Sequence, residues 1–129
     1  MILGLGVDLV RVSRIERAVA RFGERFFDHI LGPEERRHLN ERRGGRLGEW
    51  VAARFAAKEA FMKAVGLGLT KGLSWRDIEV IPDGLGKPCL RLSGRAAELC
   101  RERGALALVS LAHEAGLAMA TVILDGTPR

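Results

Sequence analysis

The stretch 46–66, RLGEWVAARFAAKEAFMKAVG, constrains the fold of this chain more than any other segment. Apolar side chains recur in it at close to helical spacing, and the alanines between them favour helix. Gly66 stands where a helix commonly ends in a left-handed residue. The sequence therefore predicts one long helix, around which the remaining elements can be placed.

Charged residues follow an ordered pattern along this helix. Glu59 and Lys63 are four residues apart and share a face, and Arg54 and Lys58 form a second pair with the same spacing. One interpretation is an ordinary surface ion pair, which stabilises a helix by only about 0.3 kcal/mol. The other is a carboxylate flanked by cations, which suits a metal ion next to phosphates. Only four of the 21 basic residues are lysines, and two of them lie here, which favours the second interpretation.

The composition indicates one globular domain that spans residues 1–129. Hydrophobic residues make up 47% of the chain and charged residues 29%, which is typical of a folded protein. The net charge of +5 favours an anionic partner, although acidic residues are interspersed. Aromatic residues are only 5% and tyrosine is absent, which leaves little material for stacking the bases of single-stranded nucleic acid.

The cellular compartment is inferred from the cysteines and the N-terminus. Cys89 and Cys100 fit neither a metal-ligand spacing nor a disulfide framework, so a reduced cytoplasmic protein is the simplest interpretation. The first residues contain no basic leader, and no apolar run approaches the roughly 18 residues of a membrane span. We therefore expect a cytoplasmic protein with no membrane segment.

The segment 2–10 is short and rich in aliphatic side chains, which predicts a buried strand. Strand alternation would put Gly4, Gly6 and Asp8 on one face. The opposite face would carry larger side chains and form the core, and it comprises Leu3, Leu5, Val7 and Leu9. A buried carboxylate is costly unless it meets a cation, a metal or several donors. Asp8 is therefore either a ligand or a salt-bridged or capping residue near the end of the strand.

A helix is predicted next, because Ser13 and Glu16 have the spacing of a capping box. We expect it to run from Ser13 to about Phe27. Four arginines follow one side of it at intervals of three and four residues: Arg14, Arg17, Arg21 and Arg25. This row suits either an acidic helix of a partner protein or a solvated surface.

The remaining elements complete an α+β pattern. Pro33 suits the first turn of another helix, which the Gly44-Gly45 pair would end, and the glycine-rich loop 66–72 could approach a phosphate. Strands are expected at 78–82 and 88–92, then a helix from Ser93 that Gly104 ends, then a hairpin of 105–113 and 117–124. This order predicts a single domain with helices on one side of an antiparallel sheet. His113 ends its strand and is either structural or catalytic.

Four motifs together resemble a known family. They are Gly4-Leu-Gly-Val-Asp8, the segment from Arg54 to Lys63 that contains Lys-Glu-Ala-Phe-Met-Lys, Gly86-Lys-Pro88, and Ser110-Leu-Ala-His113. In this order, over nearly the whole chain, they resemble the bacterial holo-[acyl-carrier-protein] synthases, the short phosphopantetheinyl transferases. The resemblance implies transfer of phosphopantetheine from coenzyme A to a serine of an acyl carrier protein, a reaction of fatty acid biosynthesis.

The resemblance also implies roles for individual residues. Asp8 and Glu59 match the family's metal ligands, and two carboxylates with water and pyrophosphate oxygens suit Mg²⁺. Lys63 matches the lysine near the transferred phosphoryl group. The serine proton would pass to His113, to Glu59 through water, or to a water on the metal. Residues expected to contact coenzyme A are Arg54, Lys58, Lys63, Gly66, Gly68, Lys87, Pro88 and His113.

The family resemblance further implies a homotrimer with active sites between subunits, in which Asp8 of one protomer lies near the Lys-Glu helix of another. The arginine row, Arg14 to Arg25, would bind the acidic carrier protein. Neither nucleic acid nor a membrane is an expected partner. Two alternatives remain: a basic nucleic-acid-binding module, whose affinity would fall steeply with salt, and a coenzyme A-binding subunit without catalytic activity.

Overall fold

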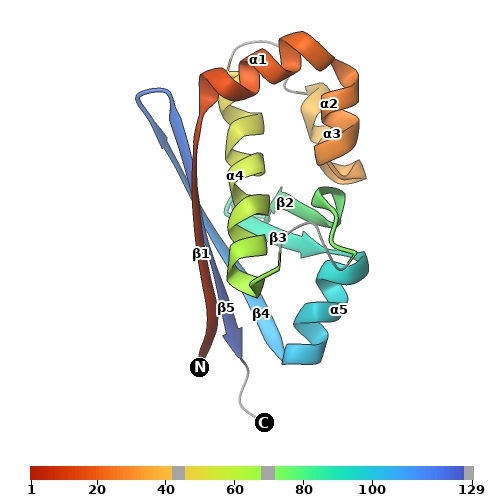
Figure 1. Cartoon of the computed structure of the whole chain (residues 1–129), viewed down its shortest axis with the longest axis vertical. Helices are drawn as coiled ribbons and strands as arrows, with labels where there is room; N and C mark the ends of the chain where they lie inside the picture. Colours follow the sequence, from red (N-terminus) through yellow and green to blue (C-terminus); the bar gives the residue numbers. More distant parts are fainter. Residues whose placement is uncertain (42–45, 68–71, 127–129) are drawn as a thin grey trace.

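The computed structural model describes residues 1–41, 46–67 and 72–126, and its centre is helix α4 (Leu47–Val65), which lies along one face of a long antiparallel sheet (Figure 1). The strand order in this sheet is β1 (Ile2–Arg11), β5 (Leu117–Gly126) and β4 (Ala105–Glu114). A second sheet pairs β2 (Ile78–Pro82) with β3 (Pro88–Leu92). Antiparallel sheets with helices on one side confirm the predicted α+β class.

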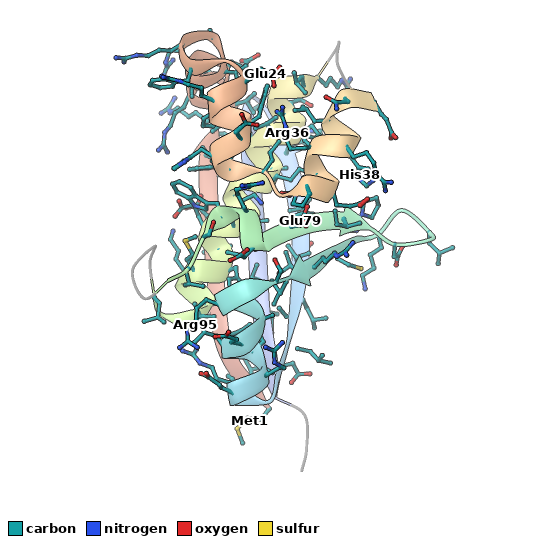
Figure 2. The ribbon with its side chains drawn as sticks, turned by 90° about the vertical axis from the view of Figure 1, so that its right-hand side faces the viewer. Met1, Glu24, Arg36, His38, Glu79 and Arg95 are labelled. Atoms are coloured by element: carbon teal, nitrogen blue, oxygen red, sulfur yellow. The ribbon has the colours of Figure 1, made fainter. Side chains whose placement is uncertain are left out.

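The other helices surround α4 on the side away from the long sheet (Figures 1 and 2). Three short helices lie near its N-terminal half: α1 (Val12–Phe22), α2 (Glu24–Ile30) and α3 (Pro33–Glu41). The 3-10 turn η1 (Trp75–Asp77) precedes β2, and α5 (Gly94–Arg103) follows β3. Among the described residues, none of the helices is long and apolar enough to cross a membrane.

Helix α4 is enclosed by neighbours on nearly every side. Most of its side chains are buried, including the alanines that the sequence shows between the larger apolar residues. It ends as predicted, because Gly66 adopts a left-handed conformation with φ of 80°. The N–H of Gly66 donates to the carbonyl oxygens of Met62 and Lys63.

The predicted orientation of strand β1 is wrong. Its glycine face, not its aliphatic face, packs on the helix: a Cβ at Gly4 would collide with the carbonyl oxygen of Ala64, and one at Gly6 with that of Ala60. Glycine is therefore required here for the close approach of two backbones. The aliphatic face is exposed instead, with Leu5 63% and Leu9 60% accessible.

The outer face of the three-stranded sheet is therefore apolar, and none of the residues that the structure describes covers it. The pairing register aligns Leu5 of β1 with Ile123 of β5 and Leu108 of β4. Leu9 of β1 lies opposite Met119 of β5. The exposed large apolar residues of this face, which we call the outer sheet face, are Leu3, Leu5, Val7, Leu9, Leu106, Leu108 and Met119. An apolar surface of this extent is typical of an interface.

Two expectations for the first helix are also wrong. Helix α1 begins at Val12, and its N-cap is Arg11, so Ser13 is not a capping residue. The N–H of Val12 donates instead to the carbonyl oxygen of Gly116 in the β4–β5 turn, at 2.9 Å. The helix ends at Phe22 because Gly23 has φ of 59° and ψ of −135°, which breaks the expected continuous helix into α1 and α2. The Gly44-Gly45 pair lies outside the described residues.

Candidate functional site

A carboxylate and a lysine meet where strand β1 crosses the C-terminal half of α4. The Nζ atom of Lys63 lies 3.0 Å from Oδ1 of Asp8 and donates to the carbonyl oxygen of Val7 at 2.9 Å. The side chain of Asp8 is 18% exposed and that of Lys63 is 55% exposed. The fold brings these two residues, 55 positions apart, together because Gly4 and Gly6 allow β1 to lie directly on the helix.

Glu59 lies one helical turn before Lys63 and is half-buried. Asp8 follows Gly6 on the face of β1 that packs against Ala60, which places its carboxylate at the level of the turn that carries Glu59. Within the described residues, no three His, Cys, Asp or Glu side chains gather as a metal site. A divalent ion held by Asp8 and Glu59 would therefore take its other oxygens from water and substrate, and the lysine now beside Asp8 shows that this carboxylate accommodates a cation.

One part of the family expectation is corrected here. The resemblance placed Asp8 of one protomer near the Lys-Glu helix of another protomer. In the structure Asp8 already contacts Lys63 of the same chain, so one protomer supplies both sides of this cluster.

Lys58 has a different environment from the one expected of a phosphate-binding lysine. Its side chain is 0% exposed, and Nζ lies 2.6 Å from Oε1 of Glu35 and donates also to the carbonyl oxygens of Trp75 and Ile78. All three of its N–H donors are thus used inside the protein. Burial lowers the pKa of Lys58, and the nearby Glu35 opposes this shift. The structure therefore corrects the expected contact between Lys58 and coenzyme A.

Two buried carboxylates complete the network around Lys58. Oε2 of Glu35 accepts the N–H of Val80, and its Oε1 accepts the N–H of Gly32. Glu79 accepts the N–H groups of Glu34 and Glu35 at the start of α3, where a carboxylate is favoured by the helix dipole. Figure 2 shows Glu79 at the junction of α3 and the β2–β3 sheet. The Lys58 network thus joins α4, α3 and β2.

The other residues expected to contact coenzyme A occupy several places. Arg54 is half-buried on α4 with its guanidinium carbon 4.2 Å from the ring centroid of Trp50. Gly66 is exposed at the end of α4, Lys87 is exposed in the β2–β3 turn, and Pro88 begins β3. Gly68 lies outside the described residues. Coenzyme contacts by these residues remain predictions.

His113 lies at the opposite end of α4 from Lys63. It is about half exposed, and its Nδ1 is 3.5 Å from Oε2 of Glu49 in the first turn of the helix. Glu49 and Glu59 are ten residues apart, which is about 15 Å along a helix. The structure therefore does not bring His113 to the Asp8–Lys63 pair of its own chain, and a role for it in proton transfer would require the site of another protomer.

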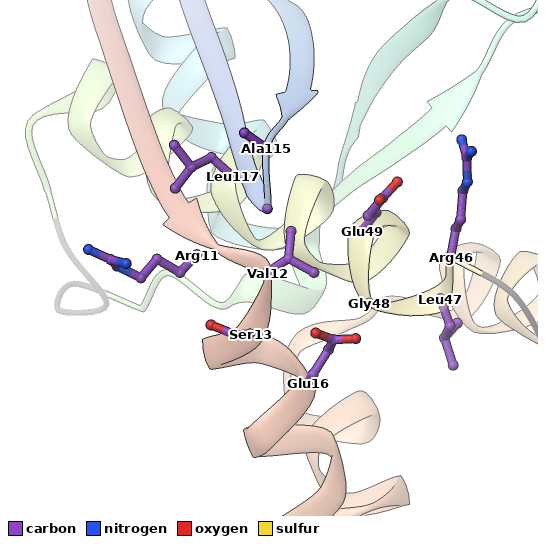
Figure 3. Close-up of a pocket in the computed structure, with 11 residues that line it drawn as sticks. Arg11, Val12, Ser13, Glu16, Arg46, Leu47, Gly48, Glu49, Ala115 and Leu117 are labelled. Atoms are coloured by element: carbon purple, nitrogen blue, oxygen red, sulfur yellow. The ribbon is translucent and has the colours of Figure 1, made fainter.

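A cavity of about 650 Å³ lies near this end of the sheet, where α1 and α4 begin (Figure 3). Its charged lining comes from Arg11 and Glu16 near the β1–α1 junction and from Arg46 and Glu49 at the start of α4. The sequence gives no sign that these residues line a common cavity, since Glu16 has the spacing of a capping residue, Arg46 and Glu49 belong to the start of the long helix, and they approach one another only through the fold. The same is true of Glu35 and Glu79, which resemble ordinary surface acids in the sequence.

The arginine row is exposed as expected but spans two helices. Arg14, Arg17 and Arg21 lie on α1, whereas Arg25 lies on α2. The guanidinium carbons of Arg21 and Arg25 are 5.1 and 5.9 Å from the ring centroid of Phe22, which is itself 43% exposed. The row therefore combines positive charge with an accessible aromatic ring.

Comparison with known proteins identifies the family. The sequence model of the family described as the 4'-phosphopantetheinyl transferase superfamily matches residues 4–122 of this chain. This chain belongs to that superfamily. A holo-[acyl-carrier-protein] synthase from Yersinia pseudotuberculosis is 49% identical over 125 residues, which are 96% of this chain and 98% of the relative.

Two solved structures extend the comparison to the fold. The holo-[acyl-carrier-protein] synthase of Neisseria meningitidis has a TM-score of 0.88 and 38% identity, and the match covers 97% of this chain and 99% of the other. That of Bacillus anthracis, in complex with coenzyme A (3',5'-ADP), has a TM-score of 0.82 and 38% identity, with coverages of 98% and 99%. These matches confirm the family resemblance stated from the sequence motifs.

Proposed function

We propose that this member of the superfamily transfers 4'-phosphopantetheine from coenzyme A to a serine hydroxyl of apo acyl carrier protein. The products are holo acyl carrier protein and adenosine 3',5'-bisphosphate. The observation that carries the proposal is the Asp8–Lys63 pair at 3.0 Å, with Glu59 one turn away, in a chain that matches holo-[acyl-carrier-protein] synthases over nearly its full length. Such a site offers two carboxylates for a cation and one ammonium for a phosphate.

The reaction is a displacement at phosphorus. The serine oxygen forms a bond to the phosphorus that carries pantetheine, and the bridging P–O bond breaks, so the nucleotide leaves with the electron pair. Asp8 and Glu59 would hold Mg²⁺, which neutralises charge on the pyrophosphate. Lys63 is exposed enough to turn toward the same phosphates and stabilise the charge that develops there.

The serine proton needs an acceptor near this cluster. Glu59 is half-buried, and it lies one helical turn from Lys63 in the same chain. It can therefore accept the serine proton through a water molecule. His113 is remote from that cluster in the same chain, as its contact with Glu49 shows. It serves this role only if a neighbouring protomer brings it there.

We also propose a homotrimer, as in the family resemblance. The outer sheet face supports this, because its leucines are exposed in a single chain and would be covered by neighbouring copies. The carrier protein would bind the arginine row, where Phe22 offers an apolar contact between Arg21 and Arg25. Acidic helices are the complementary partner for such a row.

Intact-mass analysis of an apo acyl carrier protein, incubated with coenzyme A, Mg²⁺ and this protein, tests the proposal. We expect a gain of roughly 340 Da, the mass of one phosphopantetheine group. The gain should vanish with EDTA, with Asp8→Ala and with Glu59→Ala, but persist with Glu102→Ala, which removes an exposed carboxylate on α5. Light scattering of the purified protein without the carrier protein should give about three times the 14.1 kDa chain mass.

Failure of the wild-type protein to modify any of several carriers would refute the transferase assignment. Salt-dependent binding to an oligonucleotide without Mg²⁺ would then support the nucleic-acid-binding alternative. Coenzyme A binding without transfer, unchanged in Lys63→Met, would support the non-catalytic subunit.

A further inference from the structure

We propose that Lys63 occupies the cation position at Asp8 in the metal-free protein and moves from Asp8 to the coenzyme's pyrophosphate when a divalent ion binds. The lysine thus has two successive partners, and the metal drives the exchange. This inference rests on the proposed function, because it assigns the phosphate and the metal to the site described above. It adds an order of events that the family resemblance does not contain.

The first support is the geometry of the pair. Nζ of Lys63 is 3.0 Å from Oδ1 of Asp8 and 2.9 Å from the carbonyl oxygen of Val7. These two oxygens hold the ammonium group in a defined place on the exposed edge of β1, the terminal strand of its sheet. A metal ion that approaches Asp8 must either share this carboxylate with the ammonium or displace it, and two cations on one carboxylate repel each other.

The second support is the difference between the two lysines of the same motif. Lys58 is 0% exposed and is fixed by Glu35 and two carbonyl groups, so it cannot move without breaking the core. Lys63 is 55% exposed, and its charged partner among the described residues is Asp8. An exposed ion pair is weak and is exchanged at low cost, whereas a buried one is not. Only Lys63 is therefore suited to change partners during the reaction.

The exchange has a thermodynamic consequence. A metal that displaces Lys63 from Asp8 frees its ammonium group for the coenzyme, so the two ligands bind with positive coupling, part of which passes through Lys63. Without the lysine, the metal has no internal competitor and should bind the free protein more tightly. The same change should weaken the coupling between metal and coenzyme A.

Equilibrium binding of Mn²⁺, followed by the electron paramagnetic resonance of the free ion, tests this on the full chain. We expect Lys63→Met to lower the Kd of Mn²⁺ without coenzyme A by about twofold to fivefold, the range expected when an exposed ion pair no longer competes. With saturating coenzyme A the increase in Mn²⁺ affinity should be smaller in Lys63→Met than in the wild type. Arg101→Met, which removes one exposed positive charge from α5, controls for net charge and should behave as wild type.

Asp8→Asn identifies the site, since binding that survives this change occurs elsewhere. A Kd for Lys63→Met equal to or above the wild-type value, or no detectable Mn²⁺ binding by this variant, would overturn the exchange. The transfer assay with wild-type protein separates this result from failure of the proposed function. Transfer by the wild type with unchanged Mn²⁺ affinity in Lys63→Met refutes the exchange alone, whereas no transfer by the wild type refutes the function.

Discussion

Replacing Lys58 by methionine should destabilise the protein strongly while leaving the Asp8–Lys63 ion pair in place. The change removes the ammonium group from a position where both Lys58 and Glu35 are 0% exposed, and it keeps most of the side-chain length. Removing one partner of a buried ion pair typically costs about 3–5 kcal/mol, because the other charge remains buried. Glu35 retains two N–H donors, from Gly32 and Val80, so we expect about 3 kcal/mol.

Urea unfolding followed by circular dichroism measures this loss. A loss of about 3 kcal/mol is a large part of the roughly 5–15 kcal/mol that stabilises a typical domain. Lys87→Met is the matched control, since it removes an exposed lysine from the β2–β3 turn and should change the free energy of unfolding by less than about 0.5 kcal/mol. The double variant Lys58→Met with Glu35→Gln removes both charges, and its loss should be smaller than the sum of the two single losses by about 1–3 kcal/mol.

The opposite pattern would refute this interpretation. If Lys58→Met unfolds at the wild-type urea concentration but binds coenzyme A much more weakly, Lys58 contacts the ligand and not Glu35. Additive losses in the double-variant cycle would likewise show that Lys58 and Glu35 do not interact in solution.

Two further changes test the packing and the turn. Gly6→Ala should lower the free energy of unfolding in urea by about 1–3 kcal/mol, because the added Cβ would collide with the backbone of α4. Gly84→Ala is the control and should be nearly neutral, because no atom lies within 4 Å of a Cβ at that position. Equal effects of the two changes would refute the close packing of β1 on α4. The N–H groups of Leu85 and Lys87 lower the pKa of Asp83 from 3.8. Its contribution to stability is therefore present above pH 3.8 and lost as the pH falls through the lower folded-state pKa. As the pH falls from 3.8 through this lowered pKa, the wild type should lose more free energy of unfolding than Asp83→Asn. Parallel pH profiles of the two proteins would show that the N–H groups of Leu85 and Lys87 do not stabilise the ionised carboxylate.

Local sequence signals were sufficient for most of the elements. Helix α4, the two hairpins and the left-handed end at Gly66 follow from apolar spacing and glycine placement, which act over a few residues. The pairing of Asp8 with the Lys-Glu helix was anticipated from the family motifs, although in a different chain of the assembly. These features need no knowledge of which surfaces face each other.

The errors concern contacts between residues distant in the sequence. Alternation in β1 correctly separated glycines from leucines, but the buried face is decided by the neighbour: a helix rich in alanine accepts the backbone of a glycine face. The start of α1 depends on Gly116, more than a hundred residues away from Val12. In the same way, nothing near Lys58 in the sequence indicates that Glu35 lies beside it.

The two lysines of the Lys-Glu-Ala-Phe-Met-Lys motif have different environments because they lie on different faces of the helix. Successive residues of an α-helix are rotated by about 100°, so Lys58 and Lys63 point about 140° apart, whereas Glu59 and Lys63 differ by only about 40°. The first lysine therefore faces α3 and β2 and stabilises the core through Glu35. Glu59 and Lys63 face the edge of β1, where Asp8 lies. A single helix thus anchors the fold on one side through the buried Lys58 and presents on the other side the exposed Lys63 and Glu59, the residues proposed to act on the phosphates and the metal.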